Sequence, residues 1–299
     1  MVAVRRLIDK PIIHPELFAL NGGDNINGPS LISAPDWLSG RLGNFYLYFA
    51  HHNGTYIRLA YADRLEGPWT LYQAGTLQLA EAKACHDHIA SPDVHVDYTK
   101  KEFIMYFHGV VLGTNQQRTF LARSKDGLTF DVGYKPLADF YLRAVRWGNY
   151  WIGMSKGGVM YISESMDGDY RQLPNPAFPM RHPQGNAPGD VRHVALKVLG
   201  NSLQIYYSKI GDMPEKIYRA TVDLTKPIEN WIATNCEIVM IPERPWEGCH
   251  LPLTRSKAGR APGPENALRD PAIFTFQNRT YLLYSAAGES SIGIAELID

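Results

Sequence analysis

The chain has 299 residues, of which 45% are hydrophobic and 20% are charged, an ordinary composition for a folded protein with a large core. The 30 lysines and arginines balance the 30 aspartates and glutamates, so there is no basic field to favour nucleic acid or anionic lipid. No apolar run approaches the ~20 residues that span a membrane. The first residues lack the apolar core of a signal peptide, so we expect a cytoplasmic protein.

Cysteine and cofactor signals are sparse. The three cysteines, Cys85, Cys236 and Cys249, show no CxxC spacing, which argues against a disulfide framework and a zinc–thiolate site. The sequence also lacks a phosphate-binding glycine-rich loop, a G-x-S-x-G motif and a dinucleotide fingerprint. We therefore expect no required cofactor.

Along the chain, one pattern of short strands recurs five times. Its clearest element is an aromatic-rich second strand, at Phe45–Ala50, Phe103–His108, Tyr150–Ser155, Leu203–Ser208 and Tyr281–Ser285. A first strand precedes each copy, at Gly28–Ile32, Ser91–His95, Leu142–Arg146, Val191–Ala195 and Asp270–Phe274. A repeat of roughly 50–60 residues with four strands is typical of propeller blades. The pattern therefore predicts an all-β fold, a five-bladed β-propeller of four-stranded antiparallel blades.

These repeats predict a single propeller domain over residues 1–299. The blades are placed at residues 24–80, 86–135, 140–175, 188–241 and 268–299, and a Pro- and Gly-rich active-site loop occupies 242–268. The last blade ends after its third strand, so its outer strand is either absent or supplied by Val2–Ile8. The second arrangement would close the ring and protect a sheet edge.

Polar side chains gather where the inner strands begin, which in a propeller is the mouth of the central funnel. The set comprises Asp24, Asn27, His88, Asp93, Arg143, Asp190, Arg192, His193 and Asp270, with Trp246, Glu247 and His250 on the loop before the last blade. Buried charge is costly unless it is paired or used, so this convergence favours a functional site. An aspartate beside proline also caps turns, and that structural role suits Asp270 and Asp93 as well.

Two or three carboxylates around a funnel are what glycoside hydrolysis requires, one as base or nucleophile and another as proton donor. A histidine can replace the donor, because its ordinary pKa lies near the operating pH. In Glu247-x-x-His250 either residue could be that donor, and Trp246 could stack on a sugar ring.

The histidines offer a competing use as metal ligands. His86, His88 and the pair His51-His52 have suitable side chains, but their spacing matches no zinc motif, and no oxygen-rich calcium loop is evident. We expect no catalytic metal, while a structural divalent cation in the central channel stays open.

The motifs resemble those of the five-bladed propeller glycosidases of glycoside hydrolase families 43 and 117. The likeness is carried by Asn27–Ile32, Tyr46–Phe49, Tyr61–Trp69 and Ser91–Val94, while the closing Leu268–Phe274 and Tyr281–Glu289 look more like family 117. Family 43 implies an aspartate base in the first blade, an aspartate modulator and a glutamate acid. The usual Asp-Pro of the first blade is Gly28-Pro29 here, so the base has to be Asp24 or another residue.

The resemblance to family 117 implies an inverting exo-enzyme that removes 3,6-anhydro-L-galactose from agar oligosaccharides, with a histidine proposed as the acid. By order and spacing, this resemblance implies Asp24 as base, Asp190 as modulator and His250 as acid, with Glu247 nearby. The expected substrate-binding residues are then Asn27, His88, Asp93, Arg143, Arg192, His193, Trp246 and Asp270.

We therefore expect an exo-acting, inverting glycoside hydrolase for short plant or algal oligosaccharides, either 3,6-anhydro-L-galactosidase-like or arabinosidase-like. A glycoside phosphorylase is the first alternative, with a phosphate pocket formed by Arg143, Arg192, His193 and Lys209. The second alternative is a propeller that binds carbohydrate without cleaving it, because propellers host many functions. A homodimer also stays open.

Overall fold

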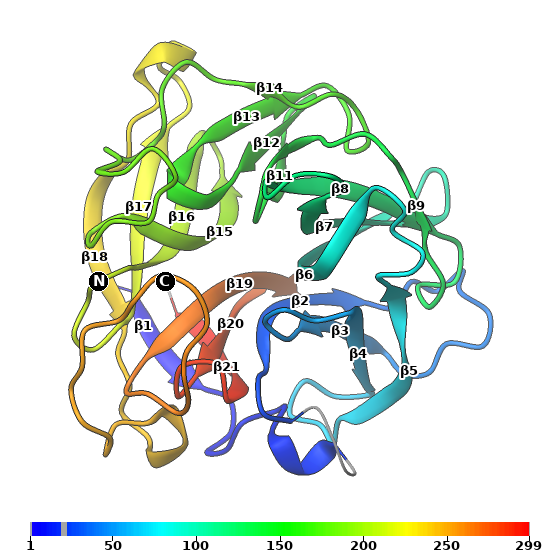
Figure 1. Ribbon diagram of the computed structural model, residues 1–299, viewed down its shortest axis with the longest axis horizontal. Helices are drawn as coiled ribbons and strands as arrows, with labels where there is room; N and C mark the ends of the chain where they lie inside the picture. The colour runs from blue at the N-terminus through cyan, green and yellow to red at the C-terminus, as the bar shows by residue number, and fades with distance from the viewer. Residues whose placement is uncertain (1, 19–22, 299) are drawn as a thin grey trace.

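The structure is a computed structural model that describes residues 2–18 and 23–298. Met1, residues 19–22 and Asp299 lie outside the described residues, and two of these are the ends of the predicted domain. The described chain forms five antiparallel sheets, arranged as a ring of blades around a common centre (Figure 1). The predicted all-β, five-bladed propeller is confirmed.

The blades follow one another along the chain. Blade 1 contains β2 (Asn27–Ser33), β3 (Phe45–Ala50), β4 (Tyr56–Ala62) and β5 (Thr70–Gln78). Blade 2 contains β6 (Cys85–Asp97), β7 (Glu102–Val111), β8 (Gln117–Ser124), β9 (Asp131–Val132) and β10 (Ala138–Asp139). Blade 3 contains β11 (Arg143–Trp147), β12 (Tyr150–Met154), β13 (Met160–Ser163) and β14 (Arg171–Gln172).

The remaining two blades complete the ring. Blade 4 contains β15 (Val191–Leu199), β16 (Ser202–Lys209), β17 (Ile217–Asp223) and β18 (Thr234–Met240). Blade 5 contains β19 (Leu268–Phe276), β20 (Arg279–Ala286), β21 (Ser291–Ile298) and β1 (Ala3–Arg6). Short 3₁₀ turns lie between strands at η1 (Pro15–Leu17), η2 (Lys156–Gly158), η3 (Ile228–Asn230) and η4 (Pro245–Glu247). Within the described residues, no helix is long and apolar enough to cross a membrane.

The N-terminal strand β1 closes the ring, as the second of the two predicted arrangements requires. It pairs antiparallel with β21, with Ala3 opposite Ile298 and Arg6 opposite Ala295. Figure 1 shows β1 as the outer strand of the last blade, beside β21. The pairing satisfies an edge of β21 that would otherwise be open to other strands.

The hydrophobic core is divided into clusters that lie between neighbouring blades. On β3, Phe45, Leu47 and Phe49 pack against blade 5, while Tyr46 and Tyr48 pack against blade 2. Both faces of the strand are therefore buried, which explains why the second strands read as continuous apolar runs rather than as alternating patterns.

The outer edge of blade 2 differs from the predicted single strand. It is divided into β9 and β10, which pair with different parts of β8, and it extends to Asp139, beyond the predicted end at residue 135. Pro136 lies in the gap between the two strands. Because proline has no N–H to give to a ladder, the interruption at this point is expected.

Three inner strands carry the same irregularity at the same level. The pairing register shifts at Gly28-Pro29 in β2, at Ser91-Pro92 in β6 and at Asp270-Pro271 in β19. The residue before each proline has a positive φ, of 61° at Gly28, 51° at Ser91 and 48° at Asp270. Such bulges break the alternation of side chains and redirect them, which places polar groups at the centre of the ring.

Candidate active site

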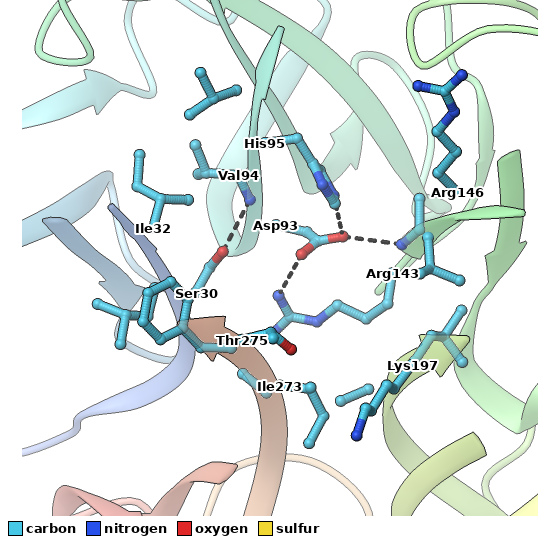
Figure 2. Close-up of a pocket in the computed structure, with 18 of the residues that line it drawn as sticks. Ser30, Ile32, Asp93, Val94, His95, Arg143, Arg146, Lys197, Ile273 and Thr275 are labelled. Atoms are coloured by element: carbon cyan, nitrogen blue, oxygen red, sulfur yellow. Dashed lines mark hydrogen bonds and ion pairs between the residues drawn. The ribbon is translucent and has the colours of Figure 1, made fainter. Parts of the chain in front are cut away.

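The inner strands line one cavity with their first residues and another with their later residues. Asn27, Ser91, His193 and Asp270 line a narrow space of about 10 Å³, which we call the deep cavity. Farther along the same strands, Ser30–Ser33, Asp93–Val96, Ala195–Val198 and Ala272–Thr275 line a space of about 540 Å³, the far cavity (Figure 2). The deep cavity has room for about one water molecule.

A third space adjoins the deep cavity. It measures about 280 Å³ and shares His52, Tyr141 and His193 with the deep cavity, so the two cavities adjoin. We call it the mouth cavity. Its volume falls just below the ~300–1,000 Å³ typical of ligand pockets, which suits a ligand of about one sugar unit.

Ionisable groups from several blades converge on the deep cavity. The lining residues with rings or charges are His52 of blade 1, His88 and His108 of blade 2, Tyr141 next to blade 3, His193 of blade 4, and Asp270 and Glu289 of blade 5. A scaffold core has no need for such a set, because each buried polar group costs free energy unless it is satisfied.

Asp270 is a buried carboxylate held in its ionised form. It accepts hydrogen bonds from the Ser285 hydroxyl at 3.0 Å and the Gly28 N–H at 3.4 Å, and its other oxygen contacts His193 Nδ1. Burial alone would raise its pKa, but the charge and hydrogen bond of His193 and the Ser285 hydrogen bond hold the pKa well below the ordinary value. Gly28, where a first-blade aspartate was expected, thus binds a carboxylate supplied by blade 5.

Glu289 is the second buried carboxylate of the deep cavity, on the turn between β20 and β21. Asn25 and Asn27 donate to its Oε2 at 2.6 and 3.3 Å, and His52 Nδ1 lies 3.4 Å from the same oxygen. Burial would raise its pKa, but the hydrogen bond and charge of His52, aided by Arg269, lower it. Glu289 is therefore an ionised acceptor beside the water-sized space.

His193 and His108 keep ring nitrogens free at the deep cavity. His193 Nδ1 contacts Asp270, while its buried Nε2 has no hydrogen-bond partner among the described residues. Buried His108 likewise has no such partner for Nδ1. Burial lowers the pKa of both imidazoles, so both are neutral at pH 7, and Tyr141 packs edge-on against both rings.

A buried ion network supports the wall between blades 4 and 5. Arg269 is 1% exposed and contacts Glu215, Glu265 and Glu289, with nitrogen–oxygen distances of 2.8, 2.5 and 3.3 Å. Glu215 also binds Arg192, which donates to the carbonyls of Lys257 and Gly259 in the loop 242–268. The network therefore connects Glu289 with the part of the loop that lines the mouth cavity.

The structure does not bring the four predicted catalytic residues together. Asp24 is exposed and pairs with Arg260 at 3.0 Å, and His250 is exposed on the loop. The carboxylate of Asp190 accepts the backbone N–H groups of Arg181 and Ala187, so it caps its own loop. None of these side chains lines the deep or mouth cavity.

Glu247 and Trp246 have structural partners away from both cavities. Glu247 is fully buried, binds Arg6 of β1 at 2.6 Å and accepts the Tyr284 hydroxyl at 2.8 Å. Trp246 stacks on Tyr284, with ring centres 6.2 Å apart, and joins the core between blades 4 and 5. The stretch from Trp246 to Glu247 thus anchors the strand that closes the ring, and the loop reaches the mouth only near Ala258 and Gly259.

The predicted substrate-binding residues divide between the two ends of the strands. Asn27, His88, His193 and Asp270 line the deep cavity, and Arg192 lines the mouth cavity. Asp93, which lies beyond the second bulge of β6, lines the far cavity instead, and so does Arg143, the first residue of β11. Figure 2 shows Asp93 between His95 and Arg143, and Arg143 also donates to the carbonyls of Pro29 and Pro92.

The residues that the sequence analysis missed lie in the second halves of second strands or in the segments that follow these strands. His52 lies just beyond β3 and Lys156 just beyond β12, His108 lies in the second half of β7, and Glu289 lies on the turn after β20. In an antiparallel hairpin the end of the second strand lies beside the start of the first, as Ala90 opposite His108 shows. A search of both positions would have found them.

Among the described residues, no group of three or more His, Cys, Asp or Glu side chains is arranged to hold a metal ion. Asp270 and Glu289 are each engaged by separate donors, and these donors compete with any cation.

Comparison with solved structures gives the class of fold. The chain is similar to a family 43 β-xylosidase/α-arabinofuranosidase from a compost microbial metagenome, solved with xylotriose (TM-score 0.64, 12% identity, covering 98% of this chain and 95% of that one). It is also similar to a putative glycosidase of Bacteroides thetaiotaomicron (TM-score 0.66, 11% identity, 98% and 96%) and to an exo-1,5-α-L-arabinanase from a bovine ruminal library (TM-score 0.61, 11% identity, 92% and 93%). At these identities the likeness establishes the propeller fold alone.

Sequence comparison gives the family. No family model matches the sequence. The chain is 36% identical over 303 residues to protein R118 of Acanthamoeba polyphaga mimivirus, covering 91% of this chain and 83% of that protein. The chain belongs to the same protein family as R118. The resemblance of the C-terminal motifs to glycoside hydrolase family 117 stays a prediction.

Proposed function

We propose that the protein is a glycoside hydrolase whose reaction takes place where the deep and mouth cavities meet. The observation that carries the proposal is the pair of ionised, buried carboxylates, Asp270 and Glu289, beside a space for one water. Glycoside hydrolysis needs a group that activates water, a proton donor, and negative charge near the oxocarbenium-like carbon. The fold it shares with family 43 glycosidases supports the same reaction class by analogy.

His193 is the group we assign to activate water. Because Asp270 stays ionised, it holds the His193 proton on Nδ1 and leaves the Nε2 lone pair free. A water in the deep cavity donates a proton to Nε2 while its oxygen attacks the anomeric carbon. Glu289 supplies the negative charge that stabilises the positive transition state.

His52 is the proton donor we assign. It lines both cavities, and its Nδ1 lies 3.4 Å from Glu289 Oε2. As the bond from the anomeric carbon to the glycosidic oxygen breaks, His52 gives its proton to the leaving oxygen. Both histidines then exchange protons with solvent, which returns them to their starting forms.

An exo-acting, inverting mechanism fits this arrangement. The mouth cavity has space for about one sugar unit, which favours cleavage at a chain end. A water placed beside the base before the bond breaks gives direct displacement, and direct displacement inverts the configuration. The short plant or algal oligosaccharides predicted from the sequence remain the proposed substrates.

The test is a screen of aryl glycosides and of arabinan, xylan and agar oligosaccharides, with and without inorganic phosphate. We expect turnover without phosphate, a product whose first-formed anomer is inverted in proton NMR, and a loss of about 10²–10⁴-fold in His193→Gln. The exposed His250→Gln variant is the matched control and keeps its activity. Turnover only with phosphate would replace hydrolysis by phosphorolysis, and sugar binding without any product would leave a carbohydrate-binding propeller.

A further inference from the structure

The mouth cavity has a charge pattern that the proposed hydrolysis does not use. Its lining contains Lys156 and Arg192, with Gln117 and Asn186, and contains no carboxylate. The deep cavity beneath it has the opposite pattern, with two ionised carboxylates. A substrate that crosses the boundary therefore meets positive charge on its outer part.

Lys156 has no ion-pair partner among the described residues. Its ammonium donates to the Asn186 side-chain oxygen at 2.5 Å and lies 5.1 Å from the centre of the Phe140 ring. Burial and the nearby Arg192 lower its pKa to about 8, against a weaker opposing effect of Asp190. A half-buried lysine without a counter-ion is costly to a scaffold and typical of a ligand site.

The backbone holds Lys156 in place. It begins the turn η2, and the next two residues, Gly157 and Gly158, have φ values of 75° and 82°. A Cβ on Gly157 would lie 2.6 Å from Met180 Sδ, and one on Gly158 would lie 2.8 Å from the Phe178 ring. The turn is therefore packed tightly against the segment before Asp190, and Lys156 is presented at a fixed position.

Arg192 differs from Lys156 because its charge is already compensated. It binds Glu215 at 2.8 Å and donates to two loop carbonyls. Arg192 therefore adds positive electrostatic potential to the wall of the mouth cavity but offers a ligand no free donor. Lys156 keeps donor capacity, because an ammonium has three N–H groups and one is used by Asn186.

We infer that Lys156, in the field of Arg192, forms a subsite for an oxyanion next to the bond that is cleaved. The inference rests on the proposed function, since the anion has two sources: a carboxylate or sulfate group carried by the sugar, or free inorganic phosphate. An anion there would accept hydrogen bonds from the remaining N–H groups of Lys156 and would neutralise its unpaired charge. Where the sugar carries the anion, the chemical class of the substrate is an acidic sugar rather than a neutral one.

Binding experiments on the whole protein test this inference separately from hydrolysis. Calorimetry would compare methyl β-glucuronide, methyl β-glucoside and inorganic phosphate on the wild type and on Lys156→Met. We expect the anionic ligand to bind about 10- to 100-fold more weakly to Lys156→Met, while the weak binding of the glucoside is unchanged. Preference for the glucuronide assigns the anion to the sugar, and preference for phosphate with phosphate-dependent turnover assigns it to a co-substrate.

Lys209→Met is the matched control, because Lys209 also packs over an aromatic ring, Tyr218, but lines neither cavity. A second measurement needs no variant: anion binding to the wild type is lost as pH rises through about 8, where Lys156 loses its proton. Equal binding of acidic and neutral sugars, or anion binding that ignores both pH and Lys156→Met, would overturn the inference. Hydrolysis of acidic glycosides at the same rate in Lys156→Met would overturn it too and leave the proposed function standing.

Discussion

Each end of the inner strands holds an Asp–His pair, Asp93 with His95 at the far cavity and Asp270 with His193 at the deep cavity. Asp93 also binds Arg143 and the N–H of Ala144, so its oxygens are fully used. At the other end, His193 Nε2 is buried and has no partner among the described residues. The far cavity is the larger by volume, about 540 against 10 Å³, yet each oxygen of its aspartate already has a donor.

The difference between the two Asp–His pairs indicates that unsatisfied polar atoms mark the candidate active site better than cavity volume does. At the far cavity, Asp93 is bound by His95, Arg143 and the N–H of Ala144, so its carboxylate holds blades 2 and 3 together. At the deep cavity, the free Nε2 of His193 can exchange a proton with a bound water or substrate. The variants below are chosen as matched changes at the two ends.

The largest difference is expected from the two aspartates. Asp270→Asn removes the charge that fixes the His193 tautomer, so kcat/KM should fall by about 10²–10⁴-fold on any substrate that the screen identifies. Asp93→Asn should lower the melting temperature and leave kcat/KM within about threefold, a change below ~1 kcal/mol. Comparable losses of activity in both variants would remove the distinction between the two ends.

The next effect concerns stability at the boundary between the cavities. Arg143 binds the carbonyls of Pro29 and Pro92 and the carboxylate of Asp93, so it joins blades 1, 2 and 3. Arg143→Met leaves these buried acceptors without their donor and should reduce the free energy of unfolding by about 3–5 kcal/mol in urea titrations. Arg146→Met, at an exposed arginine of the same cavity, is the control and should change it by less than ~0.5 kcal/mol.

A smaller, pH-dependent effect should come from His108 at the deep cavity. Burial holds its pKa well below the ordinary value, so the folded protein keeps the ring neutral while the unfolded chain takes up a proton near pH 6.5. Below pH 6.5 the unfolded state therefore binds more protons, and stability falls as pH drops, by up to ~1.4 kcal/mol per pH unit from this group. Thermal unfolding between pH 7.5 and 5 should show a shallower decline in His108→Gln than in the wild type. An identical slope in the two proteins would contradict the assignment, and exposed His250→Gln should keep the wild-type slope.

The fold could be predicted closely because its signals are local. The aromatic second strands repeat in every blade and the X-Pro steps in three of them, and closure by the N-terminal strand follows from a missing outer strand in the last repeat. The division of β9 from β10 depended on a single proline and was not predicted.

The site was predicted only in part, because its partners are set by pairing across strands and blades. The start of each inner strand pointed to Asn27, His88, His193 and Asp270, but four later positions of the sequence reach the same space through hairpins. The loop residue Glu247 was read as a proton donor since nothing local to it shows that Arg6, 241 positions away, is its partner. Order along the chain could not distinguish such an anchor from a catalytic carboxylate.

The smallest expected effect is at Asp24, the residue that the family resemblance implied as base. Its carboxylate is exposed and pairs with Arg260 across the rim, an arrangement worth about 0–1 kcal/mol. Asp24→Asn should therefore leave both the melting temperature and kcat/KM close to wild type, with a change in rate below about threefold. The same assay on Asp270→Asn provides the scale, because the carboxylate of Asp270 accepts the N–H of Gly28 in blade 1. A loss at Asp24 as large as the loss at Asp270 would return the base to blade 1 and would require the rim to close over the deep cavity during the reaction.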